Sequence, residues 1–124
     1  MSKNVMVVDD SFTTRKMLSF LLKGEGFNVV SAENGIDALE KLPFSNIDII
    51  ITDLNMPQMD GLELVNSLKK NPDYKEIPVI MLTTESEDSD KQKGFEAGAS
   101  SYLIKPVPQD VLIKEVKKFL GSNK

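Results

Sequence analysis

The stretch IIITD at residues 49–53 is a short run of β-branched residues that ends in an aspartate. Runs this short and this rich in isoleucine are typical of strands buried on both faces of a parallel sheet. Three further apolar runs end in polar side chains: residues 5–8 before Asp9 and Asp10, 79–82 before Thr83, and 101–104 before Lys105. In open α/β sheets, ligands bind beyond the carboxyl ends of the strands. We therefore expect three carboxylates, one ammonium and one hydroxyl to meet there and form the functional site.

The segments between these runs have helical periodicity. Apolar residues recur at helical spacing over residues 13–23, 36–42, 61–70 and 109–120, and Gly, Pro or Asn-Pro ends most of these segments. Residues 29–32 predict a fifth strand. A less regular fourth helix is expected, with residues 85–90 as its first turn or entry loop and residues 95–99 as its end. Five strands alternating with five helices predict an α/β fold with right-handed crossovers and helices on both faces of the sheet.

Composition excludes several classes of function. The chain has 124 residues, which suits one domain over 1–124, and its net charge of −4 argues against nucleic-acid binding. It has no Cys and no His, so thiolate zinc sites, disulfides and histidine chemistry are excluded. No apolar run approaches the roughly 18 residues that a membrane helix needs. We expect a cytoplasmic protein without membrane contact, with chemistry that depends on carboxylates, lysine and hydroxyls.

Four motifs carry a family resemblance: residues 8–11 (VDDS), 53–57 (DLNMP), 60–61 (DG) and 105–106 (KP). Together, at the ends of the expected strands, they resemble the receiver domain of two-component response regulators in its stand-alone, CheY-like form. The resemblance implies a doubly wound five-stranded parallel sheet of order 2-1-3-4-5, a flavodoxin/CheY-like fold without an output domain. It also implies a monomeric switch of the chemotaxis or motility type rather than an enzyme. Its expected partners are a sensor histidine kinase or its phosphotransfer domain and a downstream protein bound through helix four, strand five and helix five.

The acid cluster predicts a metal and a phosphoacceptor. Two unit charges 4 Å apart interact by roughly 4 kcal/mol at an effective dielectric near 20, so three clustered carboxylates need a cation, and hard oxygen ligands favour Mg²⁺ or Mn²⁺. A carboxylate can also attack phosphorus to form an aspartyl phosphate. The resemblance implies that Asp53 is the phosphoacceptor. It further implies that Asp10, Asp53 and the main-chain carbonyl of Asn55 ligate the metal directly and that Asp9 acts through water.

The resemblance assigns roles to the remaining site residues. Lys105 would stabilise the phosphoryl oxygens, Thr83 would donate its hydroxyl to the new phosphoryl group, and Tyr102 would turn inward as Thr83 moves. Asn55 and Glu85 would tune the rate of self-dephosphorylation. The bond between Lys105 and Pro106 would be cis, whereas the sequence alone favours trans.

The residues alone leave simpler interpretations open. Asp10 or Ser11 could serve only as a helix N-cap, and Lys105 could be a surface lysine. Thr83 could be an ordinary strand residue, with Thr84 beside it, and Tyr102 a half-buried aromatic with its hydroxyl in water. A haloacid-dehalogenase-type phosphatase shares strand-end carboxylates, but it needs an aspartate where this chain has Asn55. An inactive receiver used as a scaffold would have lost at least one acid, and none is lost.

Overall fold

The computed structural model describes residues 2–84 and 88–121. Five parallel strands form one sheet in the order β2-β1-β3-β4-β5, which confirms the expected topology. The strands are β1 Asn4–Val8, β2 Asn28–Ala32, β3 Ile49–Thr52, β4 Val79–Thr83 and β5 Ser101–Ile104. Every residue of β3 and β4 is buried, as expected for central strands that are covered on both faces.

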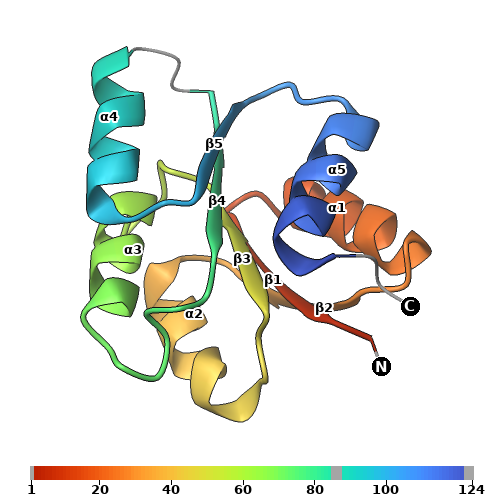
Figure 1. The fold of residues 1–124 in the computed structure, drawn as a ribbon, viewed down its shortest axis with the longest axis horizontal. Helices are drawn as coiled ribbons and strands as arrows, with labels where there is room; N and C mark the ends of the chain where they lie inside the picture. The colour runs from red at the N-terminus through yellow and green to blue at the C-terminus, as the bar shows by residue number, and fades with distance from the viewer. Residues whose placement is uncertain (1, 85–87, 122–124) are drawn as a thin grey trace.

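The helices cover both faces of the sheet, with α1 and α5 on one side and α2, α3 and α4 on the other (Figure 1). Alternate residues of β1 face the two layers. Val5 and Val7 belong to a core cluster with residues of α1 and α5, whereas Met6 and Val8 belong to a cluster with residues of α2 and α3. The helices are α1 Phe12–Gly24, α2 Gly35–Lys41, α3 Gly61–Lys69, α4 Asp88–Ala97 and α5 Gln109–Leu120.

The helix starts follow local capping chemistry. The Ser11 hydroxyl accepts a hydrogen bond from the backbone N–H of Thr14 at 3.2 Å, and Asn34 caps α2 in the same way through Asp37. Asp60 and Glu63 form a capping box at the start of α3. The capped starts of α1, α2 and α3 follow the carboxyl ends of β1, β2 and β3 along the chain.

One helix end differs in type from the expectation. The helix expected to end at Pro43 ends as an α-helix at Lys41 and continues as the 3₁₀ turn η1 Leu42–Phe44, because proline is tolerated in a first turn. The fourth helix begins at Asp88, and residues 85–87 of its expected entry lie outside the described residues. Among the residues that are described, no helix is long and apolar enough to cross a membrane.

Candidate functional site

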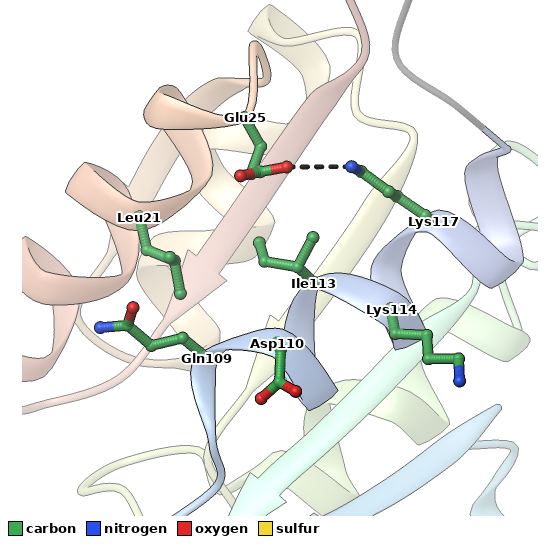
Figure 2. Close-up of a pocket in the computed structure, with 7 residues that line it drawn as sticks. All are labelled: Leu21, Glu25, Gln109, Asp110, Ile113, Lys114 and Lys117. Carbon is green, nitrogen blue, oxygen red and sulfur yellow. Dashed lines mark hydrogen bonds and ion pairs between the residues drawn. The ribbon is translucent and has the colours of Figure 1, made fainter.

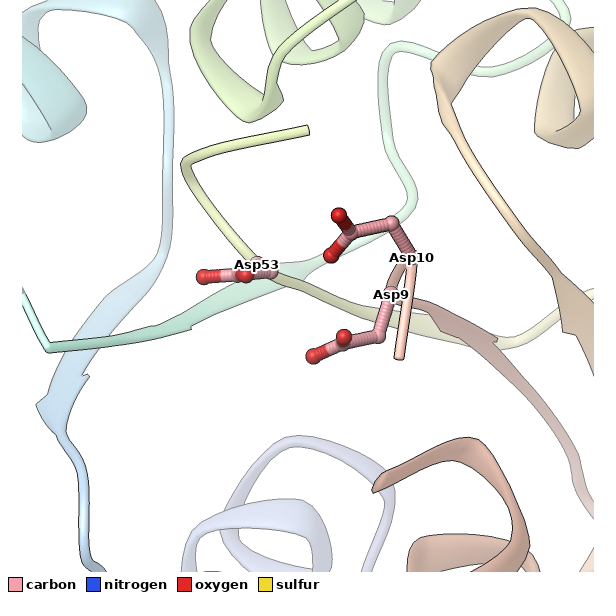
Figure 3. Close-up of side chains that lie close together, drawn as sticks. All are labelled: Asp9, Asp10 and Asp53. Carbon is pink, nitrogen blue, oxygen red and sulfur yellow. The ribbon is translucent and has the colours of Figure 1, made fainter. Parts of the chain in front are cut away.

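Three aspartates meet at the carboxyl edge of the sheet. Val8 lies opposite Thr52 in the register of β1 and β3, so the residues that follow the two strands are neighbours. One carboxylate oxygen from each of Asp9, Asp10 and Asp53 lies within 4.8 Å of the other two. Figure 3 shows the three carboxylates turned toward the same side. The sequence-predicted convergence of the acids is therefore present in the structure.

Asp9 is the most enclosed of the three acids, with 4% of its side chain exposed. Its Oδ1 accepts the backbone N–H of Ser11 at 2.8 Å, and its Oδ2 accepts the Lys105 ammonium at 3.0 Å. The guanidinium of Arg15 donates to the Asp9 main-chain carbonyl at 2.7 Å. These bonds tie the end of β1 to α1 and to the end of β5, and they compensate the buried charge of Asp9.

Asp53 lies in a less compensated environment. Its Oδ1 accepts the backbone N–H of Leu54 at 2.8 Å, and its Oδ2 lies 3.9 Å from the Lys105 ammonium. Burial raises the pKa of Asp53 above its ordinary value of 3.8, and the charge of Asp9 raises it further. Lys105, the Leu54 N–H and a hydrogen bond with the Thr83 side chain lower this pKa but do not cancel the rise. The ionised Asp53 is thus held in a site that disfavours its charge.

This raised pKa predicts that Asp53→Asn stabilises the metal-free protein. The folded state binds the Asp53 proton more tightly than the unfolded state does, so ionisation lowers stability as the pH rises through the raised pKa. Asparagine keeps the acceptor for Leu54 N–H without the charge. In urea with EDTA at neutral pH, we expect the free energy of unfolding to rise by about 1 kcal/mol, and the gain to vanish below pH 3.8.

The control for this prediction is Asp73→Asn, because Asp73 is exposed and lies outside the cluster. Its free energy of unfolding should match that of the wild type at both pH values. A stability gain in Asp53→Asn that persists unchanged at acidic pH, or a loss of stability at neutral pH, would show that the Asp53 charge is not disfavoured by its site.

Asp10 is exposed, and Ser11 is the residue whose side chain caps α1. The capping interpretation of this pair therefore applies to Ser11, and the Asp10 carboxylate is not needed for it. The Lys105 ammonium lies 3.0 Å from Asp9 and 3.9 Å from Asp53, so the three carboxylates of the cluster outnumber it. A cluster of three oxygen ligands with such an excess of negative charge fits a hard divalent cation, so the residues present suit Mg²⁺ or Mn²⁺.

The loop between β3 and α3 carries Asn55, which is exposed and lies two residues beyond Asp53. The start of α3 holds this loop, because the Gly61 N–H donates to the Leu54 carbonyl at 2.8 Å. A side chain on Gly61 would collide with the Asp53 main-chain carbonyl and would lie 3.0 Å from the Leu54 Cα. Glycine is required here because α3 begins directly against the backbone of the acid site.

The other predicted residues lie at or beside the same edge. Thr83 is the last residue of β4 and is fully buried, whereas Thr84 is exposed. The Lys105–Pro106 peptide bond is cis. Tyr102 is 9% exposed, and its ring lies 6.4 Å from that of Phe95 in α4, so the half-buried interpretation is wrong. Glu85 lies outside the described residues.

A separate groove of about 490 Å³ lies between α1 and α5, as Figure 2 shows. An ion pair of 2.9 Å between Lys117 and Glu25 crosses one end of it. Its lining contains no residue of the acid cluster. The groove is therefore distinct from the acid cluster at the carboxyl edge of the sheet.

Sequence reasoning missed several contributors to the site. The Leu54 N–H and the Arg15 guanidinium both bind the acid-bearing segments, and neither is marked by a pattern of residue types. The sequence marks Gly61 only as part of the Asp60-Gly61 motif. Backbone donors are invisible in a sequence because every residue except proline has one.

The comparisons with known proteins agree with this geometry. Residues 5–117 match the model of the response regulator receiver domain family. The chain is 40% identical over 122 residues to chemotaxis protein CheY1 of Helicobacter pylori, covering 96% of this chain and 98% of that protein. It is 35% identical to the transcriptional regulatory protein SrrA of Staphylococcus aureus over 120 residues, which are 97% of this chain and 48% of SrrA.

Among solved structures, the chain is similar to chemotaxis protein CheY4 of Vibrio cholerae, with a TM-score of 0.91 and 38% identity. That match covers 96% of this chain and 99% of the other. It is also similar to the receiver domain of a signal transduction histidine kinase from Syntrophus aciditrophicus, with a TM-score of 0.91, 36% identity and coverage of 99% and 93%. The chain, a phosphoacceptor-type module of two-component systems with the fold of the CheY-like proteins, belongs to the response regulator receiver domain family.

Proposed function

We propose that this receiver domain is a phosphorylation-controlled binding module of the chemotaxis or motility type, in which Asp53 accepts a phosphoryl group from a histidine kinase or its phosphotransfer domain. The observation that carries this proposal is the position of Asp53. Its carboxylate lies at the end of β3 beside two further acids and 3.9 Å from the ammonium of Lys105. The chemotaxis names of CheY1 and CheY4 support the type of signal.

In the proposed reaction, an oxygen of Asp53 attacks the phosphorus atom of a phosphohistidine, and the N–P bond breaks as the O–P bond forms. Lys105 lies where its ammonium can bind the phosphoryl oxygens and stabilise their charge during transfer. Asp9, Asp10, Asp53 and the main-chain carbonyl of Asn55 would hold Mg²⁺ or Mn²⁺, which when bound neutralises phosphoryl charge. Asp9, the most buried ligand candidate, would act through water.

The haloacid-dehalogenase alternative lacks its second catalytic acid. The position two residues beyond the proposed acceptor is Asn55, whose amide cannot act as a general acid or base. We propose only self-dephosphorylation for this chain, with Asn55 and Glu85 tuning access of water to the aspartyl phosphate. We further propose a single receiver domain over 1–124 that acts as a monomer without binding nucleic acid.

The proposed output surface comprises α4, β5 and α5. Thr83 is paired in register with Ile104 of β5. Movement of the Thr83 hydroxyl toward a phosphoryl group would therefore directly affect this neighbouring strand. Tyr102 packs between that strand and α4, where it contacts Phe95. Reversing a 1:99 population needs roughly 5.5 kcal/mol of differential stabilisation. A few charge-assisted hydrogen bonds to the phosphoryl group, at about 1.5–3 kcal/mol each, are enough.

The test of this function is the response of backbone amides to beryllofluoride with Mg²⁺, which mimics the aspartyl phosphate. In the wild type, we expect shifts at Asp9, Asp10 and Asp53 and also across residues 91–118. In Thr83→Ala, the shifts near the acids should remain and those across 91–118 should fall by more than about half, because the hydroxyl that links the site to β5 is missing.

Thr84→Ala is the matched control, because Thr84 is the exposed neighbour of the buried Thr83. It should respond as the wild type does. Shifts that stay confined to the acid site in the wild type would exclude α4, β5 and α5 as the output surface. A full response in Thr83→Ala would remove Thr83 from the switch.

A further inference from the structure

The β3–α3 loop contains a strained backbone conformation at Gln58. Gln58 has φ of 70°, the one positive value at a non-glycine residue in the described part of the chain. The N–H of Met59 donates to the Pro57 carbonyl at 2.8 Å, which closes a three-residue γ-turn around Gln58. Such conformations are strained and persist where surrounding contacts hold them.

The contacts come from the turn between β2 and α2. The Gly35 N–H donates to the Met59 carbonyl at 3.3 Å, and the Asn34 side-chain amide donates to the Gln58 side-chain oxygen at 3.4 Å. Asn34 is fixed from its other side, because its Oδ1 accepts the Asp37 N–H as the N-cap of α2. The γ-turn is thus bonded on consecutive residues to one rigid helix start.

Gly35 also sets how closely the two segments approach. A Cβ atom at Gly35 would lie 2.6 Å from the Cγ of Met59 and 3.0 Å from its Cβ. Contacts this short require the Met59 side chain, or the backbone that carries it, to move. Gly61 holds the loop through the Leu54 carbonyl, and Gly35 holds it through the Met59 carbonyl. Asn55 lies in the short segment between Leu54 and Met59, so a shift at Met59 is passed into that segment.

We propose that Asn34 and Gly35 are positioning residues for the acid site: they clamp the γ-turn and thereby fix the direction of the Asn55 main-chain carbonyl. This inference rests on the proposed metal site, because Asn55 is one of its proposed ligands. It extends the site to the β2–α2 turn, which carries no ligand. The substitutions that test it are in neither the acid cluster nor the switch residues.

The experiment compares Gly35→Ala with Gly24→Ala. An added Cβ at Gly24 meets nothing within 4 Å, so the second variant controls for loss of a glycine. Isothermal titration with Mg²⁺ should show a Kd about tenfold weaker in Gly35→Ala, the lower end of the loss usual for residues that orient a metal ligand. Gly24→Ala should match the wild type. The double variant Gly35→Ala/Met59→Ala, which removes Cγ and Sδ, should recover most of the affinity.

Backbone amide shifts of the metal-free proteins separate failure of this clamp from failure of the metal site. If Gly35→Ala changes the amide chemical shifts of residues 55–57 as well as that of Met59, the clamp is supported whether or not Mg²⁺ binds. If the wild type binds no Mg²⁺, the metal proposal fails while the amide shifts still decide the clamp. Displacements that stop at Met59 overturn the clamp. Where the wild type binds Mg²⁺, an affinity in Gly35→Ala equal to that of Gly24→Ala overturns the role of the clamp in positioning the Asn55 carbonyl.

Asn34→Ser provides a milder variant should Gly35→Ala not fold. Serine keeps an N-cap oxygen for Asp37 but has no amide to donate to Gln58. The amides of residues 55–58 should then shift while the amides of α2 keep their positions. Unchanged amides at 55–58 in Asn34→Ser would overturn the role of Asn34 in the clamp.

Discussion

Asp53→Asn is expected to lose phosphorylation by acetyl phosphate by a factor on the order of 10⁶, the scale seen when a nucleophile is removed from a catalytic group. Asparagine has the same shape and keeps the acceptor for the Leu54 N–H. It lacks the anionic oxygen that attacks phosphorus. Intact mass spectrometry with Mg²⁺ present should show one added phosphoryl group on the wild type and none on the variant.

Two controls separate the acceptor from the metal. Asp73→Asn, at an exposed site, should be labelled at the wild-type rate. Wild-type protein in EDTA should also remain unlabelled, because the charge of Asp9, Asp10 and Asp53 opposes the approach of a phosphate anion. Labelling of Asp53→Asn at the wild-type rate would remove Asp53 as acceptor. Wild-type labelling that is unaffected by EDTA would remove the metal from the reaction.

Lys105→Met is expected to change metal affinity and phosphoryl transfer in opposite directions. The Lys105 ammonium lies 3.0 Å from Asp9 and 3.9 Å from Asp53, so it competes with a divalent cation for the same carboxylates. Its removal should tighten Mg²⁺ binding by about tenfold, since a unit charge at 4 Å is worth up to roughly 4 kcal/mol before screening. The initial rate of phosphorylation at saturating Mg²⁺ should fall by about 100-fold, because a donor to the phosphoryl oxygens is lost.

Mg²⁺ titration and the time course of phosphorylation measure these two effects separately. Lys118→Met is the control, because the Lys118 side chain is 65% exposed and pairs with Glu115 on α5, away from the acids. It should leave both quantities unchanged. Weaker Mg²⁺ binding in Lys105→Met would show that the ammonium does not compete with the cation. An unchanged rate at saturating Mg²⁺ would show that Lys105 does not act on the phosphoryl group.

Much of the fold was predictable because a parallel sheet buried on both faces leaves a strong pattern. Residues 49–53 show this best: the isoleucines have to be buried, and the aspartate can be tolerated only where the strand emerges from the core. The same rule placed Asp9, Asp10, Thr83 and Lys105 at one edge, because parallel strands share their carboxyl ends. The end of α2 was less predictable, since Pro43 is compatible with both a helix end and the 3₁₀ turn that forms.

The sequence by itself determined the strand order through family resemblance, the edge at which the functional groups meet, and the class of cation that they suit. Only the tertiary structure decided how those groups pair. Lys105 bonds Asp9, 96 positions away, more closely than Asp53, and Gly35 contacts Met59 on a different loop. Such contacts depend on differences of about an ångström in how separate elements pack. Residue type and spacing report which groups reach an edge of the sheet, but no local pattern encodes the distances between groups held by different elements.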